Sequence, residues 1–306
     1  MKVLIIGYGS IARKHVKALR EIDSEIEIVA LRSDKNADTV EGIKNIYGWD
    51  EIDSDLTFVI ISNPTHKHYE TLLKASEIEV PIFLEKPPFH TLEGAEMLAS
   101  KLKNKSMKIY TAFNMRFLPV IAWLKNSLVG KRVLEVQIYC GSYLPDWRPG
   151  RDYRRIYSSN KDMGGGVHLD LIHEIDYAKW IFGEPTDVRK SLATISDLGI
   201  DSIDCAHYFF QYENTIVTIL LNYYRKTPKR TMEIVLSEDE WYVDLLNGTI
   251  KNSIGEIIFQ SDVSIQDTYK RQLEYFINAI NTDKQLMNNL DESIETLKIC
   301  LDDIRK

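Results

Sequence analysis

One stretch near the start decides the fold of this chain: Val3-Leu4-Ile5-Ile6-Gly7-Tyr8-Gly9-Ser10-Ile11-Ala12-Arg13-Lys14-His15. Its four leading apolar residues have the length of a buried parallel strand, and Gly7 allows a sharp turn out of that strand. Gly9 leaves no side chain where a pyrophosphate has to approach the backbone, and the small Ala12 lets a following helix pack closely. The N-terminal N–H groups of that helix would point at the phosphates. The stretch predicts a dinucleotide-binding turn, with a purely structural turn as the alternative. The residues expected at the cofactor are Gly7, Gly9, Ser10 and Ile11.

Length and composition indicate a globular protein of two domains. The chain has 306 residues, 44% hydrophobic and 27% charged, as in ordinary folded proteins. Its net charge of -7 disfavours a nucleic-acid partner but permits a local basic site for a small anion. The scattered Cys140, Cys205 and Cys300 predict neither a disulfide framework nor a zinc site. We see no signal peptide and no apolar run near the roughly 18 residues that span a bilayer, so we expect a cytoplasmic protein without a membrane partner.

Strands and helices alternate through residues 1–118. Apolar runs at 27–31, 56–61, 80–84 and 107–113 follow the first strand. This alternation predicts a Rossmann domain, a doubly wound parallel sheet whose ligands bind beyond the carboxyl ends of its strands. Polar residues stand directly after three of the runs, and we expect cofactor contacts from the first two sets. These residues are Ser62, Asn63, Pro64, His66 and His68, then Glu85 and Lys86, then Asn114 and Arg116.

The end of the second strand bears on the choice of cofactor. An acidic residue there would accept hydrogen bonds from the ribose 2′-OH of NAD. This chain instead has Arg32 and Ser33, with Asp34 one position later. The sequence therefore favours NADP over NAD as the cofactor, with a solvated Arg32 as the alternative.

Residues 119–306 predict a C-terminal α+β domain. Longer alternating runs indicate a large open sheet, mostly antiparallel and covered on one face. The segment 225–230 is interpreted as a solvated connection between strands. The aromatic residues Tyr208, Phe209, Tyr223 and Trp241 are interpreted as core or subunit interface. The expected strands are 133–139, 187–195, 206–212, 215–223, 231–236, 241–244 and 256–259, and the expected helices are 119–128, 171–182, 268–281 and 292–304.

A glycine-rich segment in this domain carries candidate acid–base residues. Gly164-Gly165-Gly166 precedes a predicted amphipathic helix that would place Asp170 and His173 on one face. Histidine titrates near neutral pH and can take an alcohol proton, while Asp170 can orient the imidazole or hold a hydroxyl. The alternative is a capping aspartate and a buried core histidine. His168 and Asp176 are interpreted as structural, and we predict no metal site.

The segment 143–155 is rich in arginine. Four arginines among aromatic residues and prolines form a rigid basic surface suited to phosphate or carboxylate. Arg148 is a candidate for the cofactor and Arg151 for an anionic substrate, although exposed loop charges are often only solvated. The remaining candidates here are Trp147 for the cofactor and Tyr143 and Tyr153 for the substrate.

In their order along the chain, these motifs resemble the Gfo/Idh/MocA family (glucose-fructose oxidoreductase, inositol dehydrogenase, rhizopine catabolism). The resemblance rests on the glycine turn, Asn63-Pro64 with His68, Glu85-Lys86-Pro87, and the three glycines followed by Asp170 and His173. It implies a Rossmann domain, a second domain whose open sheet forms a homodimer or homotetramer, and hydride transfer between NAD(P) and a secondary alcohol or ketone. The implied substrates are sugars, polyols or nucleotide-linked sugars.

The same resemblance assigns individual residues. It gives Lys86 the role of polarising a substrate oxygen, where the alternative is a surface lysine. It also places Asn114 and Arg116 at the substrate or nicotinamide, and we expect Asn114 at the substrate and Arg116 at the cofactor. Many family members separate the aspartate and histidine by four positions, whereas Asp170 and His173 are three apart. Two other functions stay open: a non-catalytic dinucleotide or sugar sensor, and an NAD-assisted glycoside-cleaving enzyme. A sensor needs neither Lys86 nor His173, so their presence favours the oxidoreductase.

Overall fold

The computed structural model describes residues 1–36 and 39–301, which form two compact units. Unit 1 comprises Met1–Phe113 and Tyr269–Glu295, and unit 2 comprises Asn114–Thr268 and the residues from Thr296 onward. The boundary expected at residue 118 lies near the first of these divisions. The sequence analysis placed the segment 269–295 in the C-terminal domain, whereas in the structure this segment packs with the N-terminal unit.

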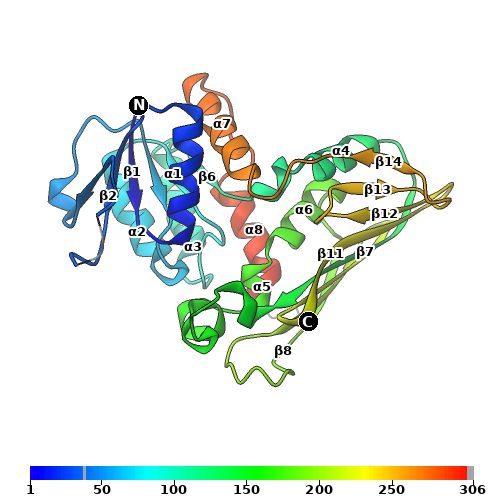
Figure 1. The fold of residues 1–306 in the computed structure, drawn as a ribbon. Coiled ribbons are helices and arrows are strands. Elements are labelled where there is room, and N and C mark those ends of the chain that lie inside the picture. The colour runs from blue at the N-terminus through cyan, green and yellow to red at the C-terminus, as the bar shows by residue number, and fades with distance from the viewer. Residues whose placement is uncertain (37–38, 302–306) are drawn as a thin grey trace. The chain divides into compact units, whose positions relative to one another are not determined.

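Unit 1 is built on a six-stranded parallel sheet in the order β3-β2-β1-β4-β5-β6 (Figure 1). This is the Rossmann arrangement that the sequence predicted. The strand order reverses between β1 and β4, and ligands of such sheets bind at that point, beyond the carboxyl ends of the strands. The strands are β1 (Lys2–Ile6), β2 (Glu27–Leu31), β3 (Ile43–Ile46), β4 (Phe58–Ile61), β5 (Ile82–Leu84) and β6 (Ile109–Thr111).

Helices cover both faces of this sheet. On one face, His15 of α1 packs edge-on against Phe83, and Phe276 of α7 packs against Phe58, Phe83 and Tyr110. Because Phe276 completes this aromatic core, the segment 269–295 belongs to unit 1. α2 contacts β4 and β5. The helices are α1 (Ser10–Ile22), α2 (His68–Ala75), α3 (Ala95–Asn104), α7 (Thr268–Asn281) and α8 (Leu290–Leu301), the last of which continues into unit 2.

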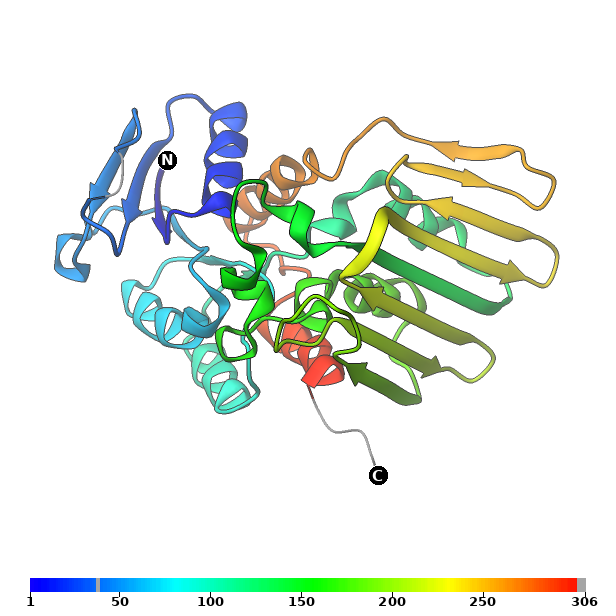
Figure 2. The same ribbon diagram turned by 60° about the horizontal axis from the view of Figure 1, so that its bottom comes forward.

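Unit 2 contains an eight-stranded sheet in the order β14-β13-β12-β11-β7-β10-β9-β8 (Figure 2). Neighbouring strands are antiparallel except for β7 and β10, so the predicted mostly antiparallel sheet is confirmed. The strands are β7 (Val133–Tyr143), β8 (Asp187–Ala193), β9 (Cys205–Gln211), β10 (Ile216–Asn222), β11 (Tyr224–Leu236), β12 (Glu240–Asp244), β13 (Thr249–Lys251) and β14 (Ile257–Gln260). The helices of this unit are α4 (Pro119–Ser127), α5 (Val167–Asp170) and α6 (His173–Phe182).

Burial alternates along the strands of this sheet. Tyr208 and Phe210 of β9 are fully buried, whereas His207 before them and Gln211 after them are exposed and Phe209 between them is half-buried. The buried face lies under α5 and α6, so the exposed positions of the described strands lie on the opposite face. No helix within residues 1–36 and 39–301 is long and apolar enough to cross a membrane.

Two local expectations were wrong. Asp170 and His173 do not lie on one continuous helix, because α5 ends at Asp170 and α6 begins at His173. Leu171 between them has φ -101° and ψ 29°, outside the α-helical range, so helical i,i+3 spacing does not apply. The segment 225–230 is part of β11 rather than a connection, with a register irregularity opposite β7. The end of the predicted helix 292–304 lies outside the described residues.

Candidate functional site

The turn after β1 requires glycine at one position and leaves open space at another. Gly7 has φ +87°, and a Cβ placed on it would lie 2.6 Å from the Cα of Asn63, so a larger residue is excluded. A Cβ on Gly9 would meet no protein atom within 4 Å. Packing therefore explains Gly7 but not Gly9, and the space above Gly9 is available to a ligand.

The N-terminus of α1 fits an anionic group. No side chain caps this end of the helix, and its first turn contains no acidic residue. Its free N–H groups and the helix dipole favour a phosphate there. Ser10 is exposed and Ile11 half-buried at this position. The glycine turn and the helix end are thus compatible with the pyrophosphate of a dinucleotide.

Two arginines gather beside Tyr8 at the carboxyl end of β2. The guanidinium carbon of Arg32 lies 5.3 Å from the centre of the Tyr8 ring, and that of Arg13 lies 6.0 Å from it. Arg32 also donates to Oδ1 of Asn45 at 3.2 Å. Ser33 and Asp34 are exposed. The strand end is therefore basic next to the glycine turn.

The segment after β4 is tied to its neighbours by its polar side chains. Ser62 Oγ donates to the carbonyl of Gly7 at 2.9 Å, and Asn63 Nδ2 donates to Thr71 Oγ1 at 2.7 Å. Pro64 is exposed, and His66 is half-buried. Ser62 and Asn63 thus fix the loop against the glycine turn and against α2.

His68 links the loops that follow β4 and β5. Its Nε2 lies 2.9 Å from the carbonyl of Asn63, and its Nδ1 lies 3.0 Å from the carbonyl of Pro87. The side chain is only 1% exposed, and burial lowers the pKa of His68. We therefore assign His68 a structural link in place of the direct cofactor contact expected from the sequence.

Lys86 stands directly after β5, at the same edge of the sheet as the glycine turn. It is half-buried, and the following Lys86–Pro87 peptide bond is cis. The preceding Glu85 is buried, and its Oε1 lies 2.6 Å from Nε2 of His15 on α1. Sequence reasoning missed His15. Its position on the apolar face of α1, between Ala12 and Ala18, was the available signal, because a buried histidine needs a polar partner.

In unit 2, two tyrosines hold the carboxylate of Asp170. Tyr157 donates its hydroxyl to Oδ1 at 2.8 Å, and Tyr223 donates to Oδ2 at 2.5 Å. Burial, and after it the charge of Asp170, raises the pKa of both tyrosines well above the usual value. Both hydroxyls therefore stay protonated and remain donors. The sequence placed Tyr223 in the core and did not single out Tyr157.

His173 begins α6, whose first turn is anchored by two buried ion pairs. Glu174 accepts from Arg230 Nε at 2.6 Å. Asp176 accepts from Nε and Nη2 of Arg116 at 2.9 and 2.6 Å. Such bidentate contacts fix position and orientation. Arg116, expected at the cofactor, is thus engaged within unit 2, and Asp176 has the structural place that the sequence favoured.

The side chain of Asn114 also makes a hydrogen bond within the protein. Its Nδ2 donates to Thr268 Oγ1 at 2.6 Å, and its side chain is buried. This bond joins the segment after β6 to the start of α7. It accounts for Asn114 without the substrate contact expected from the sequence.

The arginine-rich loop lies partly against the tyrosines of Asp170. The ring of Trp147 stands edge-on to Tyr223 with centres 5.2 Å apart, and Arg148 lies 5.7 Å from the centre of the Tyr157 ring. Further out, Arg151 is exposed and the Tyr153 hydroxyl donates to the carbonyl of Leu198. Tyr143 ends β7, with the ammonium of Lys226 3.2 Å from its ring centre.

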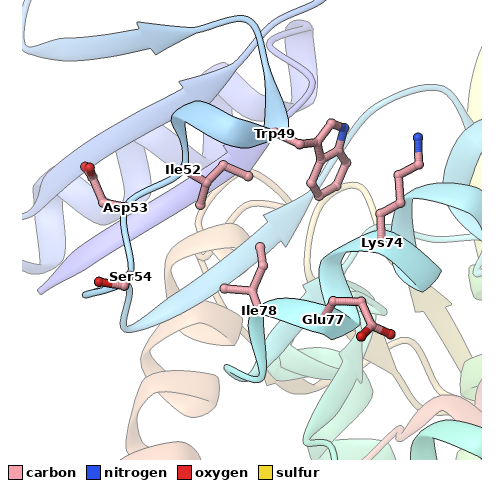
Figure 3. A pocket seen from close by; sticks show the side chains of 7 residues that line it. All are labelled: Trp49, Ile52, Asp53, Ser54, Lys74, Glu77 and Ile78. Atoms are coloured by element: carbon pink, nitrogen blue, oxygen red, sulfur yellow. The ribbon is translucent and has the colours of Figure 1, made fainter.

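A cavity of about 620 Å³ lies elsewhere in unit 1 (Figure 3). None of the residues predicted for cofactor or substrate lines it. Trp49 and Lys74 meet there, with the ammonium 5.9 Å from the indole centre. The lining residues are Trp49, Ile52, Asp53, Ser54, Lys74, Glu77 and Ile78.

Within the part of the chain that the structure describes, no group of three or more His, Cys, Asp or Glu side chains is placed to hold a metal ion. Burial lowers the pKa of His168 to about 4, so its imidazole is neutral near pH 7. A neutral, enclosed ring agrees with the structural role expected for His168.

Comparisons with known proteins identify relatives of both units. Residues 1–113 match the model described as "Oxidoreductase family, NAD-binding Rossmann fold", and residues 122–241 match the GFO/IDH/MocA C-terminal domain. Levoglucosan dehydrogenase of Pseudarthrobacter phenanthrenivorans is 30% identical over 144 residues, 46% of this chain and 37% of that protein. Myo-inositol 2-dehydrogenase of Thermotoga maritima is 25% identical over 197 residues, 61% of this chain and 56% of that protein. The matched segments thus span less than two thirds of either relative.

The fold is shared with a solved structure over almost the whole chain. UDP-N-acetylglucosamine 3-dehydrogenase from Acidithiobacillus ferrooxidans superposes with a TM-score of 0.80 at 20% identity. The superposition covers 98% of this chain and 95% of that one. Both units therefore have counterparts in one known architecture.

Proposed function

Because the chain belongs to the Gfo/Idh/MocA family of oxidoreductases, we propose that it is an NAD(P)-dependent dehydrogenase or reductase. Its substrate is a secondary alcohol or ketone of a sugar, a polyol or a nucleotide-linked sugar, the compound classes named in its relatives. One observation carries the proposal. The open glycine turn after β1 and Lys86 after β5 stand at the same edge of one parallel sheet, where such sheets bind their ligands.

The proposal gives each candidate residue a role. A bound NAD(P) supplies the carbon that accepts or donates the hydride. The ammonium of Lys86 stabilises negative charge on the substrate oxygen, and His173 takes the hydroxyl proton. The Asp170 carboxylate, fixed by two tyrosines, retains lone pairs that accept a hydrogen bond from a substrate hydroxyl. Tyr143, Arg151 and Tyr153 are the further substrate candidates.

A substrate screen tests this function. The protein is mixed with NAD or NADP and a panel of free sugars, polyols and nucleotide sugars, and the absorbance of the reduced nicotinamide is followed. We expect oxidation of at least one compound class and loss of that activity in Lys86→Ala. Tight dinucleotide binding without turnover would support a sensor instead. Cleavage of a glycoside without net change of the nicotinamide would support the glycoside-cleaving alternative.

Cofactor preference provides a separate prediction. We expect NADP to bind more tightly than NAD, because Arg32 and Arg13 gather at the strand end that faces the ribose in this fold. Arg32→Asp should reverse the preference and weaken NADP binding by about 10- to 100-fold, the loss of one charge-assisted hydrogen bond. Fluorescence titration of both reduced cofactors measures this. Lys17→Asp, at an exposed site on α1, is the control for charge alone. Equal or tighter binding of NAD by the unmodified protein would contradict the prediction and make Asp34 the ribose ligand.

The open sheet face of unit 2 is proposed as the surface of a homodimer or homotetramer. Ile216 and Tyr242 are 41% and 45% exposed on β10 and β12, and Phe209 of β9 is half-buried beside Thr218. Exposed apolar side chains on one face are typical of an association surface. We expect Thr218→Glu, on this face opposite Phe209, to shift the protein to monomers in analytical ultracentrifugation. A monomeric mass of the unmodified protein at micromolar concentration would contradict the proposal.

A further inference from the structure

A buried histidine and a buried glutamate connect α1 to the backbone of Lys86. Oε1 of Glu85 lies 2.6 Å from Nε2 of His15, and Oε2 of Glu85 accepts the backbone N–H of Lys86 at 3.2 Å. His15 is 0% exposed and Glu85 is 8% exposed. One carboxylate therefore joins the helix behind the glycine turn to the residue proposed to polarise the substrate. All three residues belong to unit 1.

The surroundings of His15 fix its ring. Phe83 and Tyr269 pack edge-on against it, with ring centres 5.1 and 5.6 Å away. A carboxylate only accepts hydrogen bonds, so Nε2 of His15 carries the hydrogen and its N–H donates a hydrogen bond to Glu85. Nδ1 of His15 has no hydrogen-bond partner among the described residues. Among the described residues, Glu85 is therefore the hydrogen-bond partner of the His15 ring.

A further charged group, Lys14, lies near Glu85. Lys14, the neighbour of His15 on α1, lies 4.9 Å from the centre of the Tyr269 ring. Burial lowers the pKa of Lys14, while Glu85 acts in the opposite direction and Lys86 adds to the lowering. Glu85 thus lies in the electrostatic range of Lys14 and is held in place by His15. Glu85 therefore binds both the His15 ring and the backbone N–H of Lys86, whereas one hydrogen bond would be enough to pair a buried histidine.

We infer that His15 is a positioning residue for the proposed hydride transfer: it holds the Glu85 carboxylate, and Glu85 holds the backbone from which the Lys86 side chain extends. The inference rests on the proposed function of Lys86. Lysine is a flexible side chain, so a fixed backbone origin narrows the positions that its ammonium samples. Displacement of a reacting group by 1 Å can cost about 10² in rate.

Three variants separate positioning from packing. His15→Leu keeps apolar volume but removes the donor to Glu85. His15→Gln keeps an N–H donor at a similar reach. Leu19→Ala creates a packing defect on the same buried face of α1, away from Glu85, and serves as the matched control.

The first measurement needs neither cofactor nor substrate. Hydrogen exchange followed by mass spectrometry reports on the peptide that contains Lys86, where Pro87 and Pro88 contribute no exchangeable amide. We expect faster exchange in this peptide in His15→Leu, and exchange like that of the unmodified protein in His15→Gln and Leu19→Ala. Unchanged exchange in His15→Leu would overturn the inference, because the Lys86 amide would then be held without His15.

The second measurement uses the active enzyme. We expect His15→Leu to lower kcat by about 10- to 100-fold, with KM and cofactor Kd changed by less than about 3-fold and with most of kcat retained in His15→Gln. In a Lys86→Ala background, His15→Leu should cause no further loss, because residues that act through one another are not additive. An equal kcat loss in Leu19→Ala, or additive losses in the double variant, would overturn the inference alone. Unchanged turnover in Lys86→Ala would overturn both the inference and the proposed function of Lys86.

Discussion

His173→Ala is expected to lower kcat for sugar oxidation by about 10² to 10⁴, the usual cost of losing a general base. The loss should shrink as pH rises, because hydroxide in the solvent then replaces the missing base. A pH profile of kcat from about pH 6 to pH 10 measures this, with cofactor Kd determined on the same samples. Cofactor affinity should change little, since the proton transfer belongs to the chemical step.

His168→Ala is the matched control for this experiment. It removes a second buried histidine, five residues before His173, to which we assign no proton transfer. It therefore reports what a packing defect in this segment does to turnover. Near-normal turnover by a folded His173→Ala variant would contradict the prediction. The proton-transfer role would then move to Asp170 or Tyr143.

Asp176→Ala is expected to lower the free energy of unfolding by about 3 to 5 kcal/mol, the cost of leaving one member of a buried ion pair without its partner. Both of its oxygens bind the guanidinium of Arg116, and neither side chain is more than 8% exposed. Urea unfolding followed by tryptophan fluorescence is a suitable measurement. Four of the five tryptophans lie in unit 2, and Trp180 stands 5.6 Å from the Arg116 guanidinium.

Two further variants serve as controls for the effect of Asp176→Ala on stability. Asp187→Ala breaks an exposed pair with Arg189 in the same unit, and its effect should be only a small fraction of that of Asp176→Ala. The double variant Arg116→Met with Asp176→Leu should recover much of the lost stability, because no charge is then left buried. If Asp176→Ala were no more destabilising than Asp187→Ala, the pair would not anchor α6.

The parallel sheet of unit 1 was predictable because its strands are buried on both faces. β4 is apolar throughout and β1 is apolar after Lys2, and the two strands are followed by glycine or proline turns, so their positions follow from the sequence alone. β3 was missed because Ile43–Ile46 contains Lys44 and Asn45 and lies at the sheet edge. Edge strands carry such polar residues and lack the continuous apolar signal.

The contacts that fix the candidate side chains were not predictable from local sequence. The sequence analysis placed Arg230 in a solvated connection, yet this arginine pairs with Glu174, which lies 56 positions earlier. The two tyrosines of Asp170 come from a loop and from the end of β10, on opposite sides of it in the sequence. Pairings of this kind depend on the path of the chain in space. The sequence therefore indicated which residue types carry the chemistry, but not which neighbours hold them.

The order of synthesis has a consequence for the core of unit 1. Phe58, Phe83 and Tyr110 leave the ribosome early, whereas Phe276, which packs against all three, follows only after Asn114–Thr268 has been made. Until then the nascent parallel sheet keeps part of one apolar face uncovered, and exposed faces of this kind promote aggregation. The segment Met1–Phe113 is thus the first part of the protein to be synthesised, but its core is completed only after Tyr269–Glu295 has been made.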